Sequence, residues 1–159
     1  MCTCSRRSFL GMALVAQMAL SACTRQTEGP EEIRYGREAC TMCGMIISDP
    51  RFAAEIRGGP DRALVKFDDM GDAVNWLEMQ AWRNESLLEF WVMDSDNGKD
   101  WLDARNSHYL TGQISPMDYG YAAVKDARTG TVSYEVMRKA ALERGITSRC
   151  PPGTEQPAQ

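Results

Sequence analysis

The alternation of apolar and polar positions predicts that the folded part of the chain begins with a β-hairpin. Two runs with the composition of strands, residues 52–56 and 63–67, flank the turn sequence Gly58-Gly59-Pro60-Asp61. Glycine and proline in such a cluster interrupt a strand and reverse the chain direction. We therefore expect two antiparallel strands that are direct neighbours in a sheet.

After this hairpin, the spacing of apolar positions changes to that of a helix. Starting at Met70, apolar residues recur at the third, fourth and seventh following positions, and Asp69 stands before them as a helix N-cap. We expect this helix to end near Trp82. The run 87–93 is rich in strand-forming residues, so the pattern predicts the order strand, strand, helix, strand.

The second half of the chain faintly repeats this pattern. Two short matches recur at an offset of 59 residues, Val65-Lys66 with Val124-Lys125 and Gly71 with Gly130. The first match lies at the end of an expected strand, and the second lies at the start of the helix expected to follow it. We therefore predict an α+β fold built from two similar β-β-α-β units.

The expected second unit has a strand at 121–125 followed by a helix. Val132, Val136 and Ala140 fall on one side of that helix, and Gly145 is a typical stop signal. The boundaries that we expect are 39–95 for the first unit, 96–148 for the second unit and 149–159 for a disordered tail.

The N-terminus is typical of an export signal and not of a folded element. Arg6 and Arg7 precede an apolar run at 9–20, which is too short to span a hydrocarbon core of ~30 Å as a helix. The arginine pair resembles a twin-arginine signal, and a general export signal is the open alternative. We expect residues 1–22 to form the removed signal peptide.

The apolar run ends in Leu20-Ser21-Ala22-Cys23, which resembles a bacterial lipobox. We therefore expect cleavage before Cys23 and lipidation of this cysteine, whose acyl chains would anchor the protein to a membrane. A plain signal peptide is the alternative. Residues 23–38 are mostly polar, and we expect them to form a flexible spacer between the membrane and the folded part.

Composition narrows the classes of function. Of the 159 residues, 18 are Lys or Arg and 22 are Asp or Glu, so the formal charge is −4. This acidic balance argues against a nucleic-acid-binding protein that works by bulk electrostatics. A single histidine excludes a site of three histidines within the chain, whereas 6 cysteines and 10 methionines make sulfur the donor in surplus.

The densest chemistry lies in the sequence Cys40-Thr41-Met42-Cys43-Gly44-Met45, which holds two thiols and two thioethers. Soft sulfur donors prefer Cu(I), whereas Zn(II) seldom takes thioethers and closes its structural sites with four ligands. Gly44 lets the backbone turn sharply, so the sulfurs of Cys43 and Met45 can converge on one ion. The motif therefore favours a Cu(I) site.

A third donor has to come from a distant segment. Met117 is the strongest candidate, because it follows Ser115-Pro116 in a polar, turn-like stretch where a long apolar side chain has no strand or helix to fill. His108 and Met42 are weaker candidates. The open alternative is that Met45 and Met117 are core residues, which is the usual role of methionine.

Other interpretations of the cysteine pair stay open. Cys40 and Cys43 have the spacing of a short disulfide or of a thiol–disulfide oxidoreductase. Redox motifs of that kind lie at a helix N-terminus, whereas the sequence after Cys43, which contains β-branched residues and Pro50, is a poor helix start. A structural lipoprotein that binds no metal is a third interpretation.

Several features together resemble NosL, the family of copper-chaperone lipoproteins of nitrous oxide reductase maturation. They are the lipobox cysteine, the polar spacer, Cys40-x-x-Cys43-Gly44-Met45, the helix start Lys66-Phe67-Asp68-Asp69-Met70 and Ser115-Pro116-Met117. The resemblance covers roughly residues 23–144, and the cysteine motif is its most specific part.

The resemblance implies a periplasmic carrier of one Cu(I) ion and not an enzyme. Its partners would be the apoprotein of nitrous oxide reductase, a copper donor or exporter, and the membrane through the lipid anchor, with no nucleic acid among them. The resemblance also implies two homologous β-β-α-β units. We carry over Cys43, Met45 and Met117 as copper ligands, and Cys40 as a further ligand.

Overall fold

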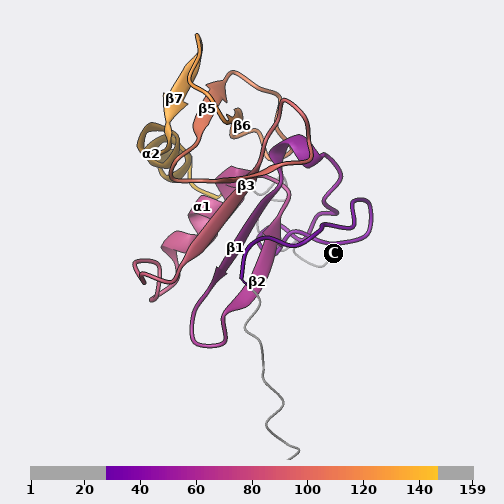
Figure 1. Cartoon of the computed structure of the whole chain (residues 1–159), viewed down its shortest axis with the longest axis vertical. Coiled ribbons are helices and arrows are strands. Elements are labelled where there is room, and N and C mark those ends of the chain that lie inside the picture. The colour runs from indigo at the N-terminus through magenta and orange to yellow at the C-terminus, as the bar shows by residue number, and fades with distance from the viewer. Residues whose placement is uncertain (1–27, 147–159) are drawn as a thin grey trace, which may run out of the picture.

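The computed structural model describes residues 28–146, which form two small antiparallel sheets and two α-helices (Figure 1). The export signal with Arg6 and Arg7, the lipidation residue Cys23 and the tail at 149–159 lie outside these residues and stay predictions. No helix within 28–146 has the length and apolarity to cross a membrane. The elements in chain order are the 3-10 helix η1 Pro50–Phe52, β1 Ala54–Gly58, β2 Ala63–Phe67, α1 Met70–Glu78, β3 Glu89–Met93, β4 Trp101–Asp103, β5 His108–Thr111, β6 Tyr121–Val124, β7 Thr131–Ser133 and α2 Tyr134–Arg144.

The predicted hairpin forms half of the first sheet, whose strand order is β2-β1-β3-β4 with antiparallel neighbours throughout. The register of β1 and β2 sets Ala54 opposite Phe67. The strand predicted at 63–67 is confirmed as β2. The strand predicted at 52–56 begins two residues later, because Asp49 caps the 3-10 helix η1 by accepting the N–H of Arg51.

Helix α1 packs on β1 and β2 through the apolar face that the spacing predicts. Asp69 is its N-cap, and the Asp69 side chain accepts a hydrogen bond from the N–H of Gly71 at 2.9 Å. All four apolar positions that begin with Met70 are buried. The helix ends at Glu78 and not near Trp82, whose ring packs instead over the two glycines of the β1–β2 turn.

The residues 28–38 lie on the other face of the first sheet, in front of β1 and β2 in Figure 1, with α1 behind. The N–H of Glu31 donates to the buried carboxylate of Glu55 at 2.8 Å, and the guanidinium of Arg57 pairs with Glu31 at 3.0 Å. Strand β1 is therefore buried on both faces. Residues 28–38 belong to the folded body, and the predicted flexible spacer stays a prediction only for 23–27.

The second unit has the strand order β6-β5-β7, and α2 follows β7. The α+β class and the presence of two units are confirmed, but within 28–146 the second unit runs strand, strand, strand, helix. The predicted boundary between 95 and 96 does not separate the sheets, because β4 pairs with β3 of the first sheet. The strand match of the sequence repeat is real in three dimensions. Val65 lies in β2 and Val124 in β6, and each of these strands is an edge strand of its sheet.

Helix α2 buries a different face from the predicted one. Tyr134 and Met137 are buried, whereas Val136 is 52% exposed. The prediction placed Val132 in the helix, but Val132 lies in β7, so the helix begins later and in another phase. Gly145 ends the helix with a φ of 69°, as expected for a stop signal.

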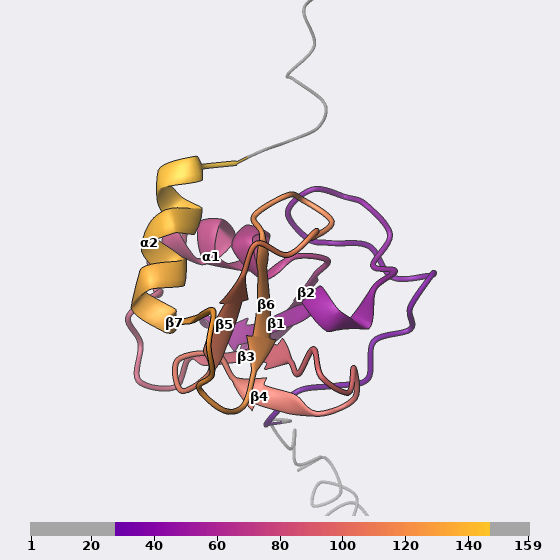
Figure 2. The same ribbon diagram turned by 90° about the horizontal axis from the view of Figure 1, so that it is seen from above.

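The two helices lie side by side and join the two units, as Figures 1 and 2 both show. The buried side chain of Asn75 in α1 donates to the carbonyl of Ala141 in α2 at 3.1 Å and to the hydroxyl of Tyr119 at 3.3 Å. Buried polar groups need such partners, so this amide fixes the seam between the units.

Candidate metal centre

The Cys-x-x-Cys-Gly-Met sequence folds into a tight loop closed by an antiparallel bridge between Ala39 and Ile46. The N–H of Cys40 donates to the carbonyl of Met45 at 2.7 Å, and the N–H of Gly44 donates to the carbonyl of Cys40 at 3.0 Å. Gly44 has a φ of 74°, in the left-handed region that favours glycine. The sharp turn predicted at this glycine is therefore confirmed. We call residues 39–46 the cysteine loop.

The cysteine loop is attached to the first sheet at its base. The N–H of Thr41 donates to the carbonyl of Lys66 in the edge strand β2 at 2.8 Å. Beyond the loop, the N–H of Ile47 donates to the carbonyl of Glu38 at 2.9 Å, and the Ile47 side chain is fully buried in the core. These contacts hold the loop against the start of α1.

The cysteine loop brings two thiols next to a buried carboxylate. The Sγ atoms of Cys40 and Cys43 and one carboxylate oxygen of Asp72 all lie within 4.8 Å of one another. Both thiols are free, and the Sγ of Cys40 lies 3.5 Å from Oδ2 of Asp72. Two sulfurs that each bind one metal ion at about 2.3 Å are at most about 4.6 Å apart, so the pair is close to a chelating geometry.

Asp72 comes from the first turn of α1, where the Asp69 cap fixes the helix start. Its side chain is 1% exposed, and its Oδ1 has no hydrogen-bond partner among residues 28–146. A buried oxygen without a partner is uncommon in folded proteins, because it loses its hydration without compensation. Such an oxygen beside two thiols makes the cluster a candidate cation site.

The electrostatics of the cluster favour the protonated form of the Cys43 thiol. Burial raises the pKa of the Cys43 thiol well above its ordinary value, and the neighbouring Cys40 and Asp72 raise it further, although the N–H of Met45 donates to the sulfur and acts in the opposite direction. Burial also raises the pKa of Asp72, against the lowering effect of hydrogen bonds from the two thiols. The Cys43 thiol therefore keeps its proton near neutral pH.

The two predicted methionine ligands differ in their surroundings. Met45 is in the cysteine loop, two residues after Cys43, and is 42% exposed. Met117 is 2% exposed, and its N–H donates to Oδ2 of Asp69 at 3.1 Å, which places its segment on the same helix start as Asp72. The segments that carry the predicted sulfur donors thus converge on the start of α1, and the ligand set stays a prediction.

The other two candidates lie elsewhere. His108 belongs to β5 in the second sheet, opposite Val124 and Ser133, and is not part of the thiol–carboxylate cluster. Met42, in the cysteine loop, packs against the hydrophobic core.

A close approach at Gly71 seats the Met117 segment on α1. A Cβ built on Gly71 would lie 2.0 Å from the ring of Tyr119, so the ring occupies the space that any other residue would need. The hydroxyl of Tyr119 then donates to the carbonyl of Gly145 at 2.9 Å. Residues 115–119 are therefore held between the two helices.

Sequence reasoning did not identify Asp72 as part of the site. In the sequence, Asp72 is an acidic residue in the first turn of a helix, where the helix dipole explains it without any ligand. Its burial depends on the cysteine loop and the Met117 segment, which are distant in the chain. The one local signal is that Asp72 lies between Gly71 and Ala73, two small residues that permit close packing.

Comparison with solved structures finds the crystal structure of the copper chaperone NosL from Shewanella denitrificans, with a TM-score of 0.52 and 17% sequence identity. The match covers 81% of this chain and 98% of that chain. A scan of the sequence against protein-family models gives no match, and a search of curated proteins gives none either. The fold implied by the sequence resemblance is therefore confirmed: this chain has a NosL-like fold.

Proposed function

We propose that the chain is a periplasmic metallochaperone that binds one Cu(I) ion and delivers it to nitrous oxide reductase for copper-centre assembly. The observation that carries the proposal is the cluster of Cys40, Cys43 and Asp72, whose donor atoms lie within 4.8 Å of one another. The NosL-like fold supports it, because the similar solved structure is that of a copper chaperone.

The chemistry of the donors supports copper in its cuprous state. Thiolates and thioethers are soft ligands, and Cu(I) is the soft ion of the first-row metals. We propose Cys43, Met45, Met117 and Cys40 as the ligands, with Asp72 as the carboxylate that balances the charge. Cys40 is buried and Met45 is exposed, so an ion bound by both would face the protein interior at Cys40 and the solvent at Met45.

Delivery then proceeds by exchange of ligands, with no bond made or broken in a substrate. An incoming ligand of the reductase apoprotein approaches from the exposed Met45 side, while the buried donors leave last. A copper donor or exporter would load the ion in the reverse order. Lipidation at Cys23 would keep the carrier at the membrane, where it can meet such an exporter.

A thiol–disulfide oxidoreductase fits the geometry less well. Catalytic cysteines of that class lie at a helix N-terminus, which lowers the pKa of the thiol. Here Cys40 and Cys43 lie in a hairpin loop, and burial raises the pKa of Cys43. We therefore propose a carrier and not an enzyme.

The test is an anaerobic titration of the reduced chain with Cu(I) in competition with a chromophoric chelator, followed by X-ray absorption to count sulfur ligands. We expect one bound ion, and we expect Cys43→Ser to weaken binding at neutral pH by at least about a hundredfold, since even residues that only support a metal ligand contribute 10–100-fold. Cys150→Ser is the matched control, because it removes a thiol that does not belong to the cysteine loop. Wild-type affinity in Cys43→Ser would exclude this thiol from the ligand set.

A further inference from the structure

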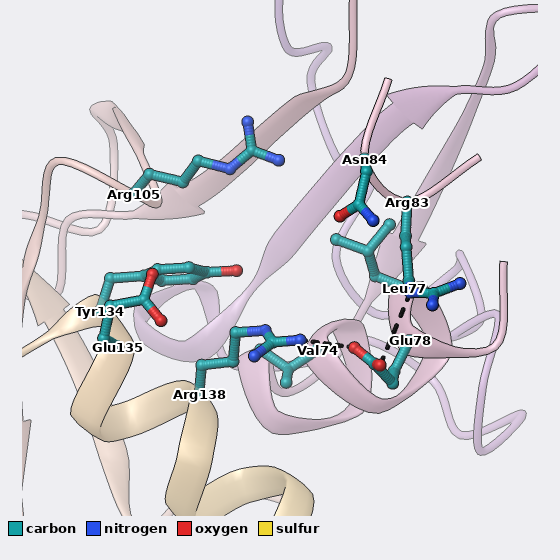
Figure 3. A pocket seen from close by; sticks show the side chains of 9 residues that line it. All are labelled: Val74, Leu77, Glu78, Arg83, Asn84, Arg105, Tyr134, Glu135 and Arg138. Atoms are coloured by element: carbon teal, nitrogen blue, oxygen red, sulfur yellow. Dashed lines mark hydrogen bonds and ion pairs between the residues drawn. The ribbon is translucent and has the colours of Figure 1, made fainter. Parts of the chain in front are cut away.

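A cavity of about 260 Å³ lies between α1 and α2, away from the cysteine loop (Figure 3). Its polar lining includes three arginines, Arg83, Arg105 and Arg138, together with Tyr134 and Asn84. In Figure 3, Arg105 and Tyr134 point in from one side toward Asn84 on the other. Arg83 runs down toward Glu78, and Arg138 lies between the two sides. The lining also includes two carboxylates, Glu78 and Glu135, so hydrogen-bond donors outnumber acidic groups around the cavity.

The side chains that line this cavity carry more positive than negative charge, although the formal charge of the whole chain is −4. Glu78 holds two of the arginines in place, because its carboxylate pairs with Arg138 at 2.5 Å and with Arg83 at 3.6 Å. Arg105 has no ion pair with any carboxylate of residues 28–146, and Glu135 is the other acidic residue of the lining. The lining thus has three positive and two negative side chains. Arg105 hydrogen-bonds the hydroxyl of Tyr134 and is the guanidinium of the lining without a carboxylate partner among residues 28–146.

The hydroxyl of Tyr134 lies within the field of two of these guanidiniums. Burial raises the pKa of Tyr134, while the positive charges of Arg105 and Arg138 lower it. The ring itself is fixed in the core by contacts with Phe90 and Tyr109, at ring-centroid distances of 6.1 and 6.3 Å. The hydroxyl is therefore a donor presented by a rigid side chain.

We infer that this cavity binds a phosphate group. Guanidiniums that approach from several sides suit a tetrahedral anion with several oxygens, and arginine binds phosphate through two parallel N–H···O bonds. The cavity also lies against the first turn of α2, whose N-cap Ser133 makes no side-chain cap hydrogen bond, so the positive end of the helix dipole adds to the attraction.

The phosphate has two possible sources, free inorganic phosphate and the headgroup of a phospholipid. Both sources present a phosphate anion to the guanidiniums, and they differ only in whether a membrane carries that anion. None of the lining residues belongs to the candidate metal centre. This inference is therefore independent of copper binding.

The first experiment titrates the purified full chain with inorganic phosphate by calorimetry in a buffer without phosphate. The second measures co-sedimentation with vesicles of phosphatidylglycerol, on a Cys23→Ser background that lacks the predicted lipid attachment. In both, Arg105→Gln is compared with Arg37→Gln, which removes the same charge from an exposed arginine outside the cavity. We expect Arg105→Gln to raise the dissociation constant about tenfold, which corresponds to one lost charge-assisted hydrogen bond, and Arg37→Gln to have no effect.

The outcomes separate the sources and can overturn the inference. Binding of inorganic phosphate that depends on Arg105 assigns the cavity to a soluble anion, and vesicle binding alone that depends on Arg105 assigns it to a lipid headgroup. Absence of Arg105-dependent binding in both experiments, or an equal loss in Arg37→Gln, overturns it. Cu(I) affinity of Arg105→Gln should equal that of the wild type, which also confirms that the variant is folded.

Discussion

At the scale of single residues, the Asp72 side chain is the carboxylate of the candidate metal centre. One carboxylate oxygen lies beside the Cys40 thiol, and the other has no hydrogen-bond partner among residues 28–146. Under the proposed function its negative charge would attract a cation, and Asp72 also helps to raise the pKa of the Cys43 thiol. Binding of the metal should therefore release thiol protons.

Asp72→Asn tests this role, because it keeps the shape of the side chain and removes its charge. We expect the affinity for Cu(I) to fall about tenfold, the lower end of the effect of residues that support metal ligands. Competition with a chromophoric chelator measures the change. Asp68→Asn is the matched control, since Asp68 is also buried beside the same helix start but accepts from Ser48 and lies outside the cluster. Equal losses in the two variants would contradict a specific role for Asp72.

Met117→Leu separates a ligand from a core residue. The substitution conserves volume, so the free energy of unfolding should fall by less than about 1.5 kcal/mol. If Met117 binds copper, X-ray absorption of the loaded variant will count one sulfur fewer and the affinity will fall. Met45→Leu is the companion variant at an exposed thioether. An unchanged sulfur count in Met117→Leu would assign this residue to packing alone.

At the scale of elements, the start of α1 is where three segments meet. The helix supplies Asp72, the cysteine loop approaches from one direction, and residues 115–119 are seated by the close approach of Tyr119 to Gly71. The site is therefore assembled from pieces that are more than 30 residues apart in the chain, and its geometry depends on how tightly these pieces pack.

Gly71→Ala tests that packing. In an ordinary helix this change is stabilising, because alanine has the higher helix propensity by about 1 kcal/mol. Here the new Cβ would meet the Tyr119 ring at 2.0 Å, so we expect a loss of about 1–3 kcal/mol in the free energy of unfolding, measured by chemical denaturation. In a Tyr119→Ala background the same change should be neutral or stabilising. A stabilising effect in the wild-type background would show that the ring moves away without cost.

The sequence predicts α1 better than α2, and the structure shows why. The apolar spacing of α1 begins directly after the N-cap Asp69, so cap and periodicity agree on the same start. Before α2, the short strand β7 ends at Ser133 and the helix begins at the next residue. Val132 therefore lies in a strand, although its spacing from Val136 is that of a helix. The two cysteines are close together in the sequence, so the sequence pattern alone predicts them as candidate ligands. Asp72 joins the cluster only through tertiary contacts, which the pattern does not contain.

At the scale of the whole molecule, the residues 28–38 bury charged groups of β1. Glu55 is fully buried, its Oε1 has no hydrogen-bond partner among residues 28–146, and the ammonium of Lys66 lies 3.9 Å away. Burial raises the pKa of Glu55 to about 7, against the hydrogen bond from the N–H of Glu31. Stability of the fold should therefore depend on pH.

The sign follows from the proton count. Between the ordinary value of 4.5 and about 7, the folded chain holds a proton on Glu55 that the unfolded chain has lost, so stability falls as pH rises through this window. The shift corresponds to a loss on the order of 3 kcal/mol. Asp69, whose pKa burial raises to about 6, contributes a fall of the same sign.

Glu55→Gln should accordingly make the dependence shallower without abolishing it. The measurement is the free energy of unfolding by denaturant at several pH values between 5 and 8. Glu32→Gln, at an exposed position of the same segment, is the control and should follow the wild-type curve. If Glu55→Gln and the wild type have parallel curves, the carboxylate of Glu55 is not the group that titrates.

The contact between Thr41 and Lys66 has a consequence for self-association. Strand β2 is the outermost strand of its sheet, and the cysteine loop occupies its outward-facing carbonyl at Lys66. An uncovered outer strand is a template on which a second chain can add its own strand and start an aggregate. The cysteine loop therefore also covers part of this edge strand. Any outward motion of the loop, such as one that the proposed release of copper would need, would expose the edge for as long as it lasts.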